Sequence, residues 1–462
     1  MRIERVYADL KTQIREDPHH PPNPWSIVLP PTHQIMKKLN AVKSIFMAIL
    51  LGFASFSASY AQDAAPLSAK DRKQISEQVW ETVNDKYYDP KLNGIDWKDI
   101  RKKYKDQLEN AANDAEFYRL LNLMVSELHD AHTRIRDPYK RILFDRMEAV
   151  SAGVSIGEVE GQNVILNVIP GSDAEKARIK PGMIVRAIDK KPIEERLKEV
   201  AQSIINSSSE RATKTMIYNA LLDGVEGAKV TLWLENPDDA TKVIEVELTR
   251  KIYSTAVQVT SAKLSSGYGY IRLNRWKDPA HEQFRQALLA LRDTPGLIID
   301  LRGNGGGSPS EVNGIGSYFF PNTVSFGKFI RRSGRPVEIE SGKPGVQIYQ
   351  NPVVILMNEA SGSGSELFAA AMQELGRAVV IGRQSCGCLL AATRRKLTGG
   401  SELNVSEFGY LSPKGNRVEG GGVTPDVAVP LTIDDIRERK DTVLAEAERI
   451  LKNGKQPMVE SR

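Results

Sequence analysis

The stretch "PVVILMNEASGSGSELFAAAMQELGRAVVIG" (Pro352–Gly382) decides the fold of the C-terminal half of this chain. An apolar run from Val353 to Met357 precedes a turn that is rich in serine and glycine. An alanine-rich segment with helical spacing follows, and a second apolar run ends the stretch. This succession of strand, turn, helix and strand predicts an α/β layer in which crossover helices connect the strands.

The middle serine of the turn, Ser363, lies at the expected N-terminus of the helix. Unpaired backbone N–H groups and the helix dipole favour negative charge at that place. Gly362 and Gly364 flank it and permit the tight backbone that a nucleophile elbow requires. Ordinary helix capping by Ser363 or Ser365, with Glu366 in the first turn, is the competing interpretation.

A second segment, "IIDLRGNGGG" (Ile298–Gly307), is an apolar strand that ends in glycines. The backbone N–H groups of such a loop approach a ligand closely, as an oxyanion hole or an anion nest requires. A phosphate-binding loop is excluded because no Gly-Lys-Ser/Thr follows the glycines. From this segment alone, the interpretation as a purely structural turn also stays open.

With 462 residues, the chain is long enough for several domains. Apolar residues at helical spacing predict an N-terminal helical domain, and short β-like runs with turns follow it. The fold class we expect is α+β and α/β multidomain. The predicted boundaries are 62–146 for the helical domain, 147–252 for a β domain with an insertion at 194–224, 253–435 for the α/β core and 436–462 for a helical tail.

The succession of strands, short helix and Pro-Gly turn in residues 147–252 resembles a PDZ domain. PDZ domains bind peptide C-termini by adding the peptide as a strand. By this resemblance the carboxylate-binding loop is expected near Ser151–Ile156, and the expected peptide-binding residues are Gly153, Val154, Ser155 and Ile156.

The N-terminal region indicates export. Residues 36–61 begin at Met36 with lysines, continue with a short apolar run and end in a small-x-small pattern at Ala61. This is the pattern of a cleaved secretory signal, and its apolar run is shorter than the ~20 residues of a membrane-spanning helix. We therefore predict a periplasmic or secreted protein without a stable membrane span. Residues 1–35 are assigned no fold, and whether they are translated is left open.

Composition excludes several other classes of function. The net charge of +5 is spread over mixed acidic and basic residues, without the basic block that nucleic-acid binding requires. Cys386 and Cys388 are the two cysteines, so no disulfide framework is expected, and free and bridged thiols both stay open. No further ligand accompanies them at a convincing spacing, so neither a metal nor another cofactor is predicted. The oligomeric state is left open.

Seven segments in this order resemble the C-terminal processing (tail-specific) peptidase family, from about Trp80 to Asp426. They are "YYDPKLNGIDW", "ELHDAHTRI", the PDZ-like unit, "IIDLRGNGGG", "NEASGSGSELFAAAM", "GRAVVIGRQSCG" and "GGGVTPDVAVPL". The resemblance implies a serine endopeptidase that recognises unstructured C-termini of protein substrates. It also implies a catalytic core of the ClpP/crotonase type.

By the same resemblance the nucleophile is Ser363, and the oxyanion donors are the N–H of Gly364 and one from Gly305 or Gly306. The general base departs from the pattern, because the position of the family's catalytic lysine falls on Cys388. A neutral thiol has no reason to act as a base towards a serine hydroxyl. Lys396 lies further on and would require a rebuilt loop.

A tricorn-like branch of the family uses a Ser–His pair, and His132 in "HDAHTRI" resembles its histidine. An ordinary pKa near 6.5 suits a general base at neutral pH. Glu419 matches the glutamate that orients the histidine in that branch, and Asp130 is the alternative. Two competing interpretations stay open. His132 could serve only in packing, and Glu419 could be a solvated turn residue. His129 and His281 are expected at the surface.

The sequence thus predicts an exported Ser–His endopeptidase that cleaves protein or peptide substrates with free C-termini. An inactive peptide-binding scaffold of the same fold is the first alternative. Another hydrolase that uses the same serine, such as an esterase, is the second.

Overall fold

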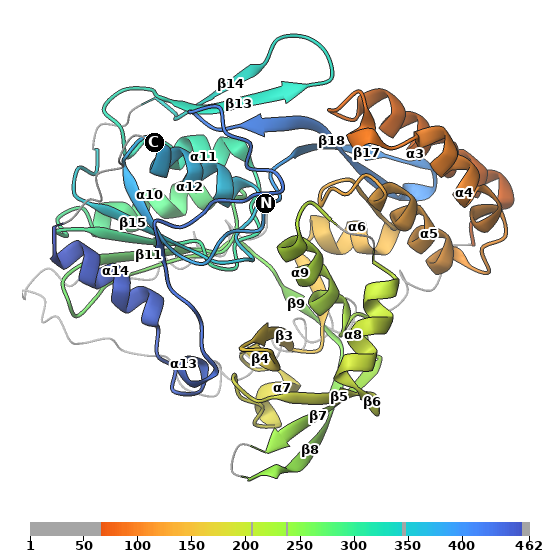
Figure 1. The fold of residues 1–462 in the computed structure, drawn as a ribbon, viewed down its shortest axis with the longest axis horizontal. Helices are drawn as coiled ribbons and strands as arrows, with labels where there is room; N and C mark the ends of the chain where they lie inside the picture. The colour runs from red at the N-terminus through yellow and green to blue at the C-terminus, as the bar shows by residue number, and fades with distance from the viewer. Residues whose placement is uncertain (1–65, 205–206, 237–238, 344–347, 455–462) are drawn as a thin grey trace, which may run out of the picture. The chain divides into compact units, whose positions relative to one another are not determined.

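The computed structural model describes residues 66–204, 207–236, 239–343 and 348–454 (Figure 1). The predicted extension 1–35 and the predicted signal 36–61 lie outside these residues. Within the described ranges, no helix combines the length and the apolarity that a bilayer crossing requires.

The N-terminal segment is helical, as predicted. Its helices begin at side-chain caps, with Ser68, Asp96 and Asn113 each accepting from backbone N–H groups of the first turn. Their apolar faces pack into one cluster that includes Tyr87 and Phe117, both fully buried. The elements are α3 (Ala69–Lys86), η1 (Leu92–Gly94), α4 (Trp97–Glu109), α5 (Asp114–Ser126), β1 (Arg134–Arg136) and α6 (Pro138–Asp145).

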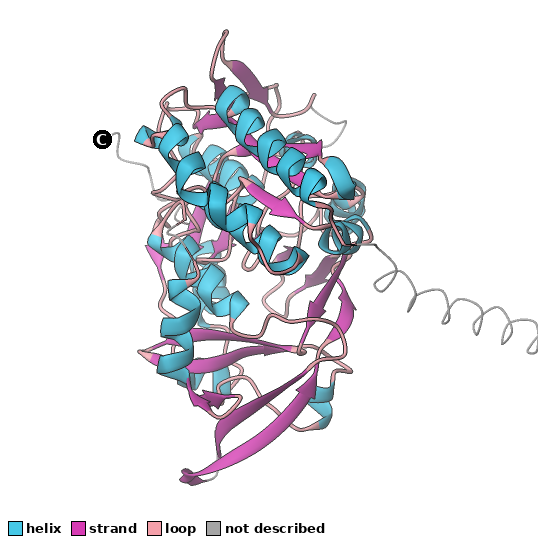
Figure 2. Cartoon of the chain, turned by 90° about the vertical axis from the view of Figure 1, so that its right-hand side faces the viewer, coloured by secondary structure: helices cyan, strands magenta, loops and turns pink. Residues whose placement is uncertain are grey.

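The segment predicted to be PDZ-like begins and ends in paired strands, because β2 (Glu148–Ser151) pairs with β9 (Lys251–Ser254). Two small antiparallel sheets, β3–β4 and β6–β5–β7–β8, lie between them, in the strand-rich lower part of Figure 2. The predicted insertion 194–224 holds most of α8 and all of α9. The elements are β3 (Val154–Val159), β4 (Gln162–Val168), α7 (Asp173–Lys176), β5 (Val185–Ile188), β6 (Lys191–Pro192), α8 (Ile193–Gln202), α9 (Glu210–Ala220), β7 (Lys229–Asn236) and β8 (Asp239–Thr249).

The core is a six-stranded sheet in the order β10-β11-β12-β15-β16-β19, parallel except for β10. Its strands are β10 (Val259–Lys263), β11 (Gly269–Leu273), β12 (Leu297–Asp300), β15 (Val353–Met357), β16 (Ala378–Gly382) and β19 (Val427–Ala428). Its helices are α10 (Ala280–Ala290), α11 (Pro309–Gly316), α12 (Gly364–Glu374) and α14 (Thr442–Lys452). The short α13 (Ile433–Arg437) packs instead with Val159 and Val164 of β3 and β4.

Successive residues of the central strands point to opposite faces of this sheet. Ile299 and Ile355 pack with α10, α11 and α12, whereas Ile298 and Val354 pack with α14. Figure 1 shows α14 on the other side of the sheet from α10 and α12. The core therefore has the α/β layers that the sequence predicts. The predicted tail supplies one of these layers, since the apolar side of α14 covers the second face of the sheet.

A second sheet joins the N-terminal segment to the core, with strand order β1-β18-β13-β14 and β17 also paired with β18. Its further strands are β13 (Ser325–Arg331), β14 (Val337–Glu340), β17 (Ala391–Lys396) and β18 (Glu402–Leu411), with η2 (Thr398–Gly400) between the last two. Arg134 of β1 lies opposite Asn404 of β18. Leu403 and Val405 pack into the N-terminal helical cluster. This sheet therefore contains strands from two of the predicted domains, and the domain boundaries stay predictions.

Candidate active site

The three serines of the turn have different surroundings. Ser361 and Ser365 are fully buried, and each hydroxyl donates to a carbonyl of the 301–304 loop at 2.8 Å. Ser365 Oγ also accepts from Trp276 Nε1 at 2.9 Å. Ser363 between them is half-buried. The middle serine is thus the one whose hydroxyl is placed to meet a ligand.

Ser363 has backbone angles φ 51° and ψ −113° at the N-terminus of α12. An ordinary capping residue is extended, and a non-glycine residue in this left-handed region costs on the order of 1–3 kcal/mol. Two contacts hold the strained residue, since its N–H lies 2.9 Å from Glu366 Oε2 and 3.0 Å from the carbonyl oxygen of Cys388. This geometry favours the nucleophile elbow over simple capping.

The glycine-rich loop lies directly against Ser363. A Cβ atom added to Gly306 would be 2.5 Å from Ser363 Cβ, so no side chain fits there. The Gly306 N–H already donates to Asn304 Oδ1 at 2.9 Å, which corrects the prediction that Gly306 is an oxyanion donor. In the part of the chain that is described, the N–H groups of Gly305 and Gly364 make no hydrogen bond. Of the two predicted alternatives, the structure therefore favours Gly305.

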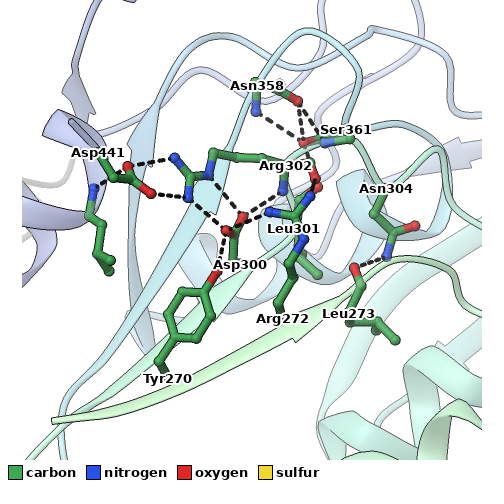
Figure 3. A network of polar contacts seen from close by, with 12 residues as sticks. Tyr270, Arg272, Leu273, Asp300, Leu301, Arg302, Asn304, Asn358, Ser361 and Asp441 are labelled. Carbon is green, nitrogen blue, oxygen red and sulfur yellow. Dashed lines mark hydrogen bonds and ion pairs between the residues drawn. The ribbon is translucent and has the colours of Figure 1, made fainter. Parts of the chain in front are cut away.

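Ionic contacts fix the start of this loop (Figure 3). Arg302 Nη2 lies 2.7 Å from the fully buried Asp300 and 2.7 Å from Asp441, the residue before α14. Tyr270 and Arg272 of β11 add bonds of 2.7 and 3.1 Å to the same Asp300 oxygen. Burial opposes ionisation of Asp300, but the bonds and charge of Arg302 outweigh it and lower the pKa of this carboxyl.

Amide side chains fix the rest of the loop (Figure 3). Asn358 Oδ1 accepts from the Gly303 N–H at 2.9 Å. Asn304 Nδ2 donates to the carbonyl of Leu273 at 2.9 Å. The backbone that faces Ser363 is therefore held in place before any ligand binds, as electrostatic stabilisation of an oxyanion requires.

Glu366 is a fully buried carboxylate at the start of α12. Besides the Ser363 N–H, it accepts from Ser385 Oγ at 2.6 Å, Gly387 N at 2.6 Å and Cys388 N at 3.1 Å. Burial raises its pKa, while the bond from Ser385 acts in the opposite direction. The sequence interpretation gave Glu366 only the role of a first-turn residue. In the structure it joins the nucleophile to the 385–388 loop.

Cys386 and Cys388 form a disulfide, which decides between the two states that the sequence left open. The bridge packs on the nucleophile turn, since a Cβ added to Gly362 would lie 3.3 Å from Cys388 Sγ. From α9, Ser209 Oγ donates to the Cys386 carbonyl, and Arg211 Nε donates to the Ser385 carbonyl at 2.6 Å. The position expected for a lysine base therefore holds a bridged loop.

His132 is half-buried in the loop that precedes β1, and its backbone N–H donates to Asp130 Oδ1 at 2.6 Å. Burial lowers the pKa of His132 to about 4, Asp130 opposes this shift, and the charge of Arg134 adds to it. His132 Nδ1 is buried without a hydrogen-bond partner. Within the described ranges, no hydrogen bond joins the imidazole to Ser363 or Glu419.

Asp130 holds the histidine loop through its backbone, not through the imidazole. Its carboxylate accepts from the N–H and the hydroxyl of Thr133 at 2.7 and 2.6 Å, and from Ser406 Oγ of β18 at 3.0 Å. Its role is therefore to anchor the loop to β18. It does not orient the ring of His132, as the alternative assignment required.

Glu419 is 9% exposed, so the interpretation as a solvated turn residue is wrong. Burial raises its pKa to about 8, against the effect of a hydrogen bond with Ser208. Its Oε2 accepts from the Leu389 N–H at 2.6 Å. Ser208 Oγ also accepts from the Ala131 N–H at 3.0 Å. Ser208, which no sequence signal indicated, thus connects Glu419 to the residue before His132.

In the part of the chain that is described, no hydrogen bond joins His281 or Lys396 to Ser363. His281 Nε2 shares a hydrogen bond with Tyr318 at 2.8 Å, and Lys396 is an exposed residue at the end of β17. His129 has a left-handed backbone conformation just before the Asp130 turn. Within the described ranges, no group of three or more His, Cys, Asp or Glu side chains is arranged to hold a metal ion.

Only part of the predicted peptide-binding segment is free to contact a peptide. The Gly153 N–H donates to Ser151 Oγ at 3.0 Å and its carbonyl accepts from the Ile169 N–H at 2.8 Å, so both backbone groups of this predicted peptide-binding residue are engaged within the fold. Val154 and Ile156 are buried, and Ser155 between them is exposed. Among the described strands β3 pairs with β4 alone, and α9 packs beside β3.

Two family models match the chain. Residues 267–429 match peptidase family S41, and residues 68–126 match the tricorn protease C1 domain. The first match contains the glycine-rich loop, the serine turn, the disulfide loop and Glu419.

The chain is also similar to named peptidases. Chloroplastic carboxyl-terminal-processing peptidase 2 of Arabidopsis thaliana is 27% identical over 373 residues, which cover 76% of this chain and 68% of that protein. The carboxyl-terminal-processing protease of Synechocystis sp. is 26% identical over 380 residues, which cover 79% of this chain and 82% of that protein.

Two solved structures share the fold. The photosystem II D1 C-terminal processing protease has a TM-score of 0.55 at 22% identity, and the match covers 82% of this chain and 97% of that one. Mature CPAF complexed with lactacystin has a TM-score of 0.65 at 14% identity, with coverage of 84% and 99%.

Proposed function

We propose that this chain, a serine-type peptidase similar to the C-terminal processing family, cleaves peptide bonds with Ser363 as nucleophile and His132 as general base. The geometry of Ser363 carries this proposal. It is the half-buried serine of the three, in a strained conformation at a helix N-terminus, against a loop that only glycine can form.

In the proposed reaction, His132 accepts the hydroxyl proton while Ser363 Oγ attacks the peptide carbonyl carbon. The N–H groups of Gly364 and Gly305 stabilise the negative oxygen of the tetrahedral intermediate. His132 then donates its proton to the leaving amine. Water, deprotonated by His132, hydrolyses the acyl-enzyme and regenerates the serine.

The His132 imidazole must come within hydrogen-bond distance of Ser363 Oγ for this chemistry. A general base has to come within about 2.6–3.2 Å of the proton donor, and such bonds often tighten only when substrate binds. The lowered pKa of His132 keeps its ring neutral at neutral pH, which is the form that accepts a proton. Glu419, linked to the histidine loop through Ser208, is the proposed positioning residue for this closure.

Substrate recognition is proposed at the free edge of β3, where a peptide C-terminus would lie beside α9 as an added strand. Since α9 also holds the disulfide loop through Ser209 and Arg211, peptides bound there would touch an element that contacts the active site. Export is proposed from the sequence signal at 36–61. A mature N-terminus at Gln62, read by mass spectrometry of the secreted protein, would support it.

Labelling with a fluorophosphonate probe, located by mass spectrometry, tests the catalytic assignment. Wild-type protein is compared with Ser363→Ala, His132→Ala and Cys388→Ala. Label on Ser363 that is lost in His132→Ala and kept in Cys388→Ala would establish the Ser–His assignment. Label that is independent of His132 would refute its role as base. If no form takes up the label but all forms bind peptides, the inactive scaffold becomes the better account.

A further inference from the structure

The aromatic ring of Phe144, in α6, lies among cationic side chains. The guanidinium carbon of Arg136 is 3.8 Å from the ring centroid, that of Arg394 is 5.3 Å away and Lys277 Nζ is 5.9 Å away. Arg134 precedes Arg136 on β1 by two residues and contributes a fourth positive charge. We call these five residues the Phe144 cationic face.

Two of the four cations are neutralised within the fold. Arg136 Nη1 lies 2.8 Å from Glu402 Oε1 and is buried. Arg394 Nη2 lies 2.6 Å from Glu402 Oε2 and 2.7 Å from Asp145 Oδ1. These ion pairs use Glu402 and Asp145, so the face keeps a positive excess from its other two cations, which the charge of Asp130 near Arg134 reduces.

Arg134 and Lys277 supply that excess. In the part of the chain that is described, neither side chain makes an ion pair or a hydrogen bond. Partial dehydration lowers the pKa of Arg134 to about 10, and the charge of Arg136 adds to this shift. Arg134 is nevertheless an exposed residue, so an anion can reach its unpaired charge and pair with it.

Arg134 lies next to the proposed base. Successive residues of an extended chain point to opposite sides, and Thr133 and Ile135 are both buried. Arg134 is the exposed first residue of β1, and His132 lies in the bend just before it. Their proximity is also evident in the effect of the Arg134 charge, which contributes to the lowered pKa of His132.

Lys277 follows in the chain a residue that contacts the serine turn. It follows Trp276, whose indole donates to Ser365 at 2.9 Å. A Cβ added to Gly364, the residue after the nucleophile, would lie 3.4 Å from the same indole. The face thus includes a residue adjacent in sequence to the histidine loop, Arg134, and one adjacent in sequence to a contact of the serine turn, Lys277.

We propose that the Phe144 cationic face is a subsite for a carboxylate of the peptide substrate, bound by Arg134 and Lys277. This rests on the proposed function, because it assumes that the peptide lies across Ser363 and His132. The planar guanidinium group of an arginine can donate two parallel hydrogen bonds to the two oxygens of a carboxylate, and a lysine adds a second positive charge. The ligand is an Asp or Glu side chain near the scissile bond or the terminal carboxylate of a short peptide.

Binding to Ser363→Ala protein tests the subsite without any catalysis. Fluorescent peptides are made in pairs that differ by Glu against Gln at one position, and each also with a free or an amidated C-terminus. We expect about tenfold tighter binding of the carboxylate form, the gain typical of one charge-assisted contact. Sensitivity to Glu→Gln identifies a side chain as the ligand, and sensitivity to amidation identifies the terminus.

In the Arg134→Gln/Lys277→Gln variant, the ratio of the two affinities, carboxylate form to neutral form, should fall towards one. Arg134→Lys keeps the charge and should keep part of the preference, which separates loss of charge from loss of fold. Lys105→Gln, on the exposed side of α4, is the matched control and should leave the preference unchanged.

Equal binding of both members of every pair would overturn the proposal, as would the absence of any peptide binding. A mixed-sequence oligonucleotide that binds as tightly, with the same dependence on Arg134 and Lys277, would also overturn it in favour of a general anion site. None of these results bears on the catalytic assignment, which fluorophosphonate labelling of Ser363 tests separately.

Discussion

At the scale of single residues, Glu366 determines how Ser363 is presented. One buried carboxylate receives four hydrogen bonds, from the backbone of Ser363, Gly387 and Cys388 and from the hydroxyl of Ser385. An amide in its place has one acceptor oxygen, so at least one buried donor loses its partner. Such a loss costs about 1–3 kcal/mol.

We therefore expect Glu366→Gln to lower the free energy of unfolding by about that amount and to slow labelling of Ser363. Thermal unfolding and the rate of labelling per folded molecule measure the two effects. Glu374→Gln is the control, because Glu374 caps another loop from the far end of α12 through Ser412 and Lys414. It should lose stability and keep the labelling rate. Equal labelling rates in both variants would contradict this role of Glu366.

The two shifted groups near the histidine loop give a second prediction at this scale. His132, with its pKa lowered to about 4, stays neutral in the folded protein while the unfolded chain takes up its proton below about pH 6.5. Its contribution to stability therefore falls as the pH decreases from 6.5 to 4. As a base, it should support a value of kcat/KM that stays level down to about pH 5 and then decreases.

Glu419 behaves in the opposite way. Its pKa is raised to about 8, so the folded protein keeps a proton that the unfolded chain loses above about pH 4.5. Its contribution to stability is complete below pH 4.5 and is lost as the pH rises through 8. Glu419→Gln should remove this dependence. We expect a smaller decrease in melting temperature between pH 5 and pH 8 than in wild type, and an equal decrease would exclude the buried proton.

At the scale of elements, several results could be predicted from local sequence. The apolar run and the glycines indicated the strand Val353–Met357 and a helix start near Ser365, and the structure has β15 and α12 at these places. Periodicity specifies such elements because it acts over a few residues. The contact of α9 with the disulfide loop joins residues more than 170 positions apart. No local pattern encodes it.

The same limit explains the residues that the sequence interpretation misjudged. From motif position, Gly306 was one of two alternatives for an oxyanion donor and Gly153 was a peptide-binding residue, yet their N–H groups donate to Asn304 and Ser151. Which backbone donor remains free depends on side chains that fold onto the loop. The burial of Glu419 likewise depends on Leu389 and Ser208, which come from distant segments.

The disulfide loop gives the third prediction. Besides the bridge, the loop is held by Glu366 and by Ser209 and Arg211 of α9. A ring closed between Cys386 and Cys388 excludes few unfolded conformations, so its loss should cost less than about 2 kcal/mol. The Cys386→Ser/Cys388→Ser protein should therefore fold and still label at Ser363. Unfolding of this variant at 25 °C would show that the bridge, and not the hydrogen bonds, holds the loop.

At the scale of the whole molecule, segments far apart in sequence build the site together. The histidine loop comes from the N-terminal segment, Ser208 from the PDZ-like segment, and the nucleophile and Glu419 from the core. The sheet that contains β1 and β18 holds the N-terminal segment against the core. The sequence interpretation identified the fold class and the order of these parts. It could not show that the C-terminal tail would complete the core.

That tail carries the last prediction. Asp441, just before α14, binds Arg302, which in turn binds the buried Asp300 at the start of the glycine-rich loop (Figure 3). Asp441→Asn keeps the shape of the side chain and removes its charge. The pair is partly exposed, so we expect a loss of no more than about 1 kcal/mol in unfolding free energy.

The loosened loop should nevertheless lower the labelling rate of Ser363 several-fold, because the Gly305 N–H must be held in place to stabilise an oxyanion. Glu446→Gln is the matched control, since Glu446 lies on α14 and pairs with Arg449 of the same helix. It should change neither quantity. A labelling rate in Asp441→Asn equal to that of the control would mean that α14 stabilises the sheet without acting on the active site.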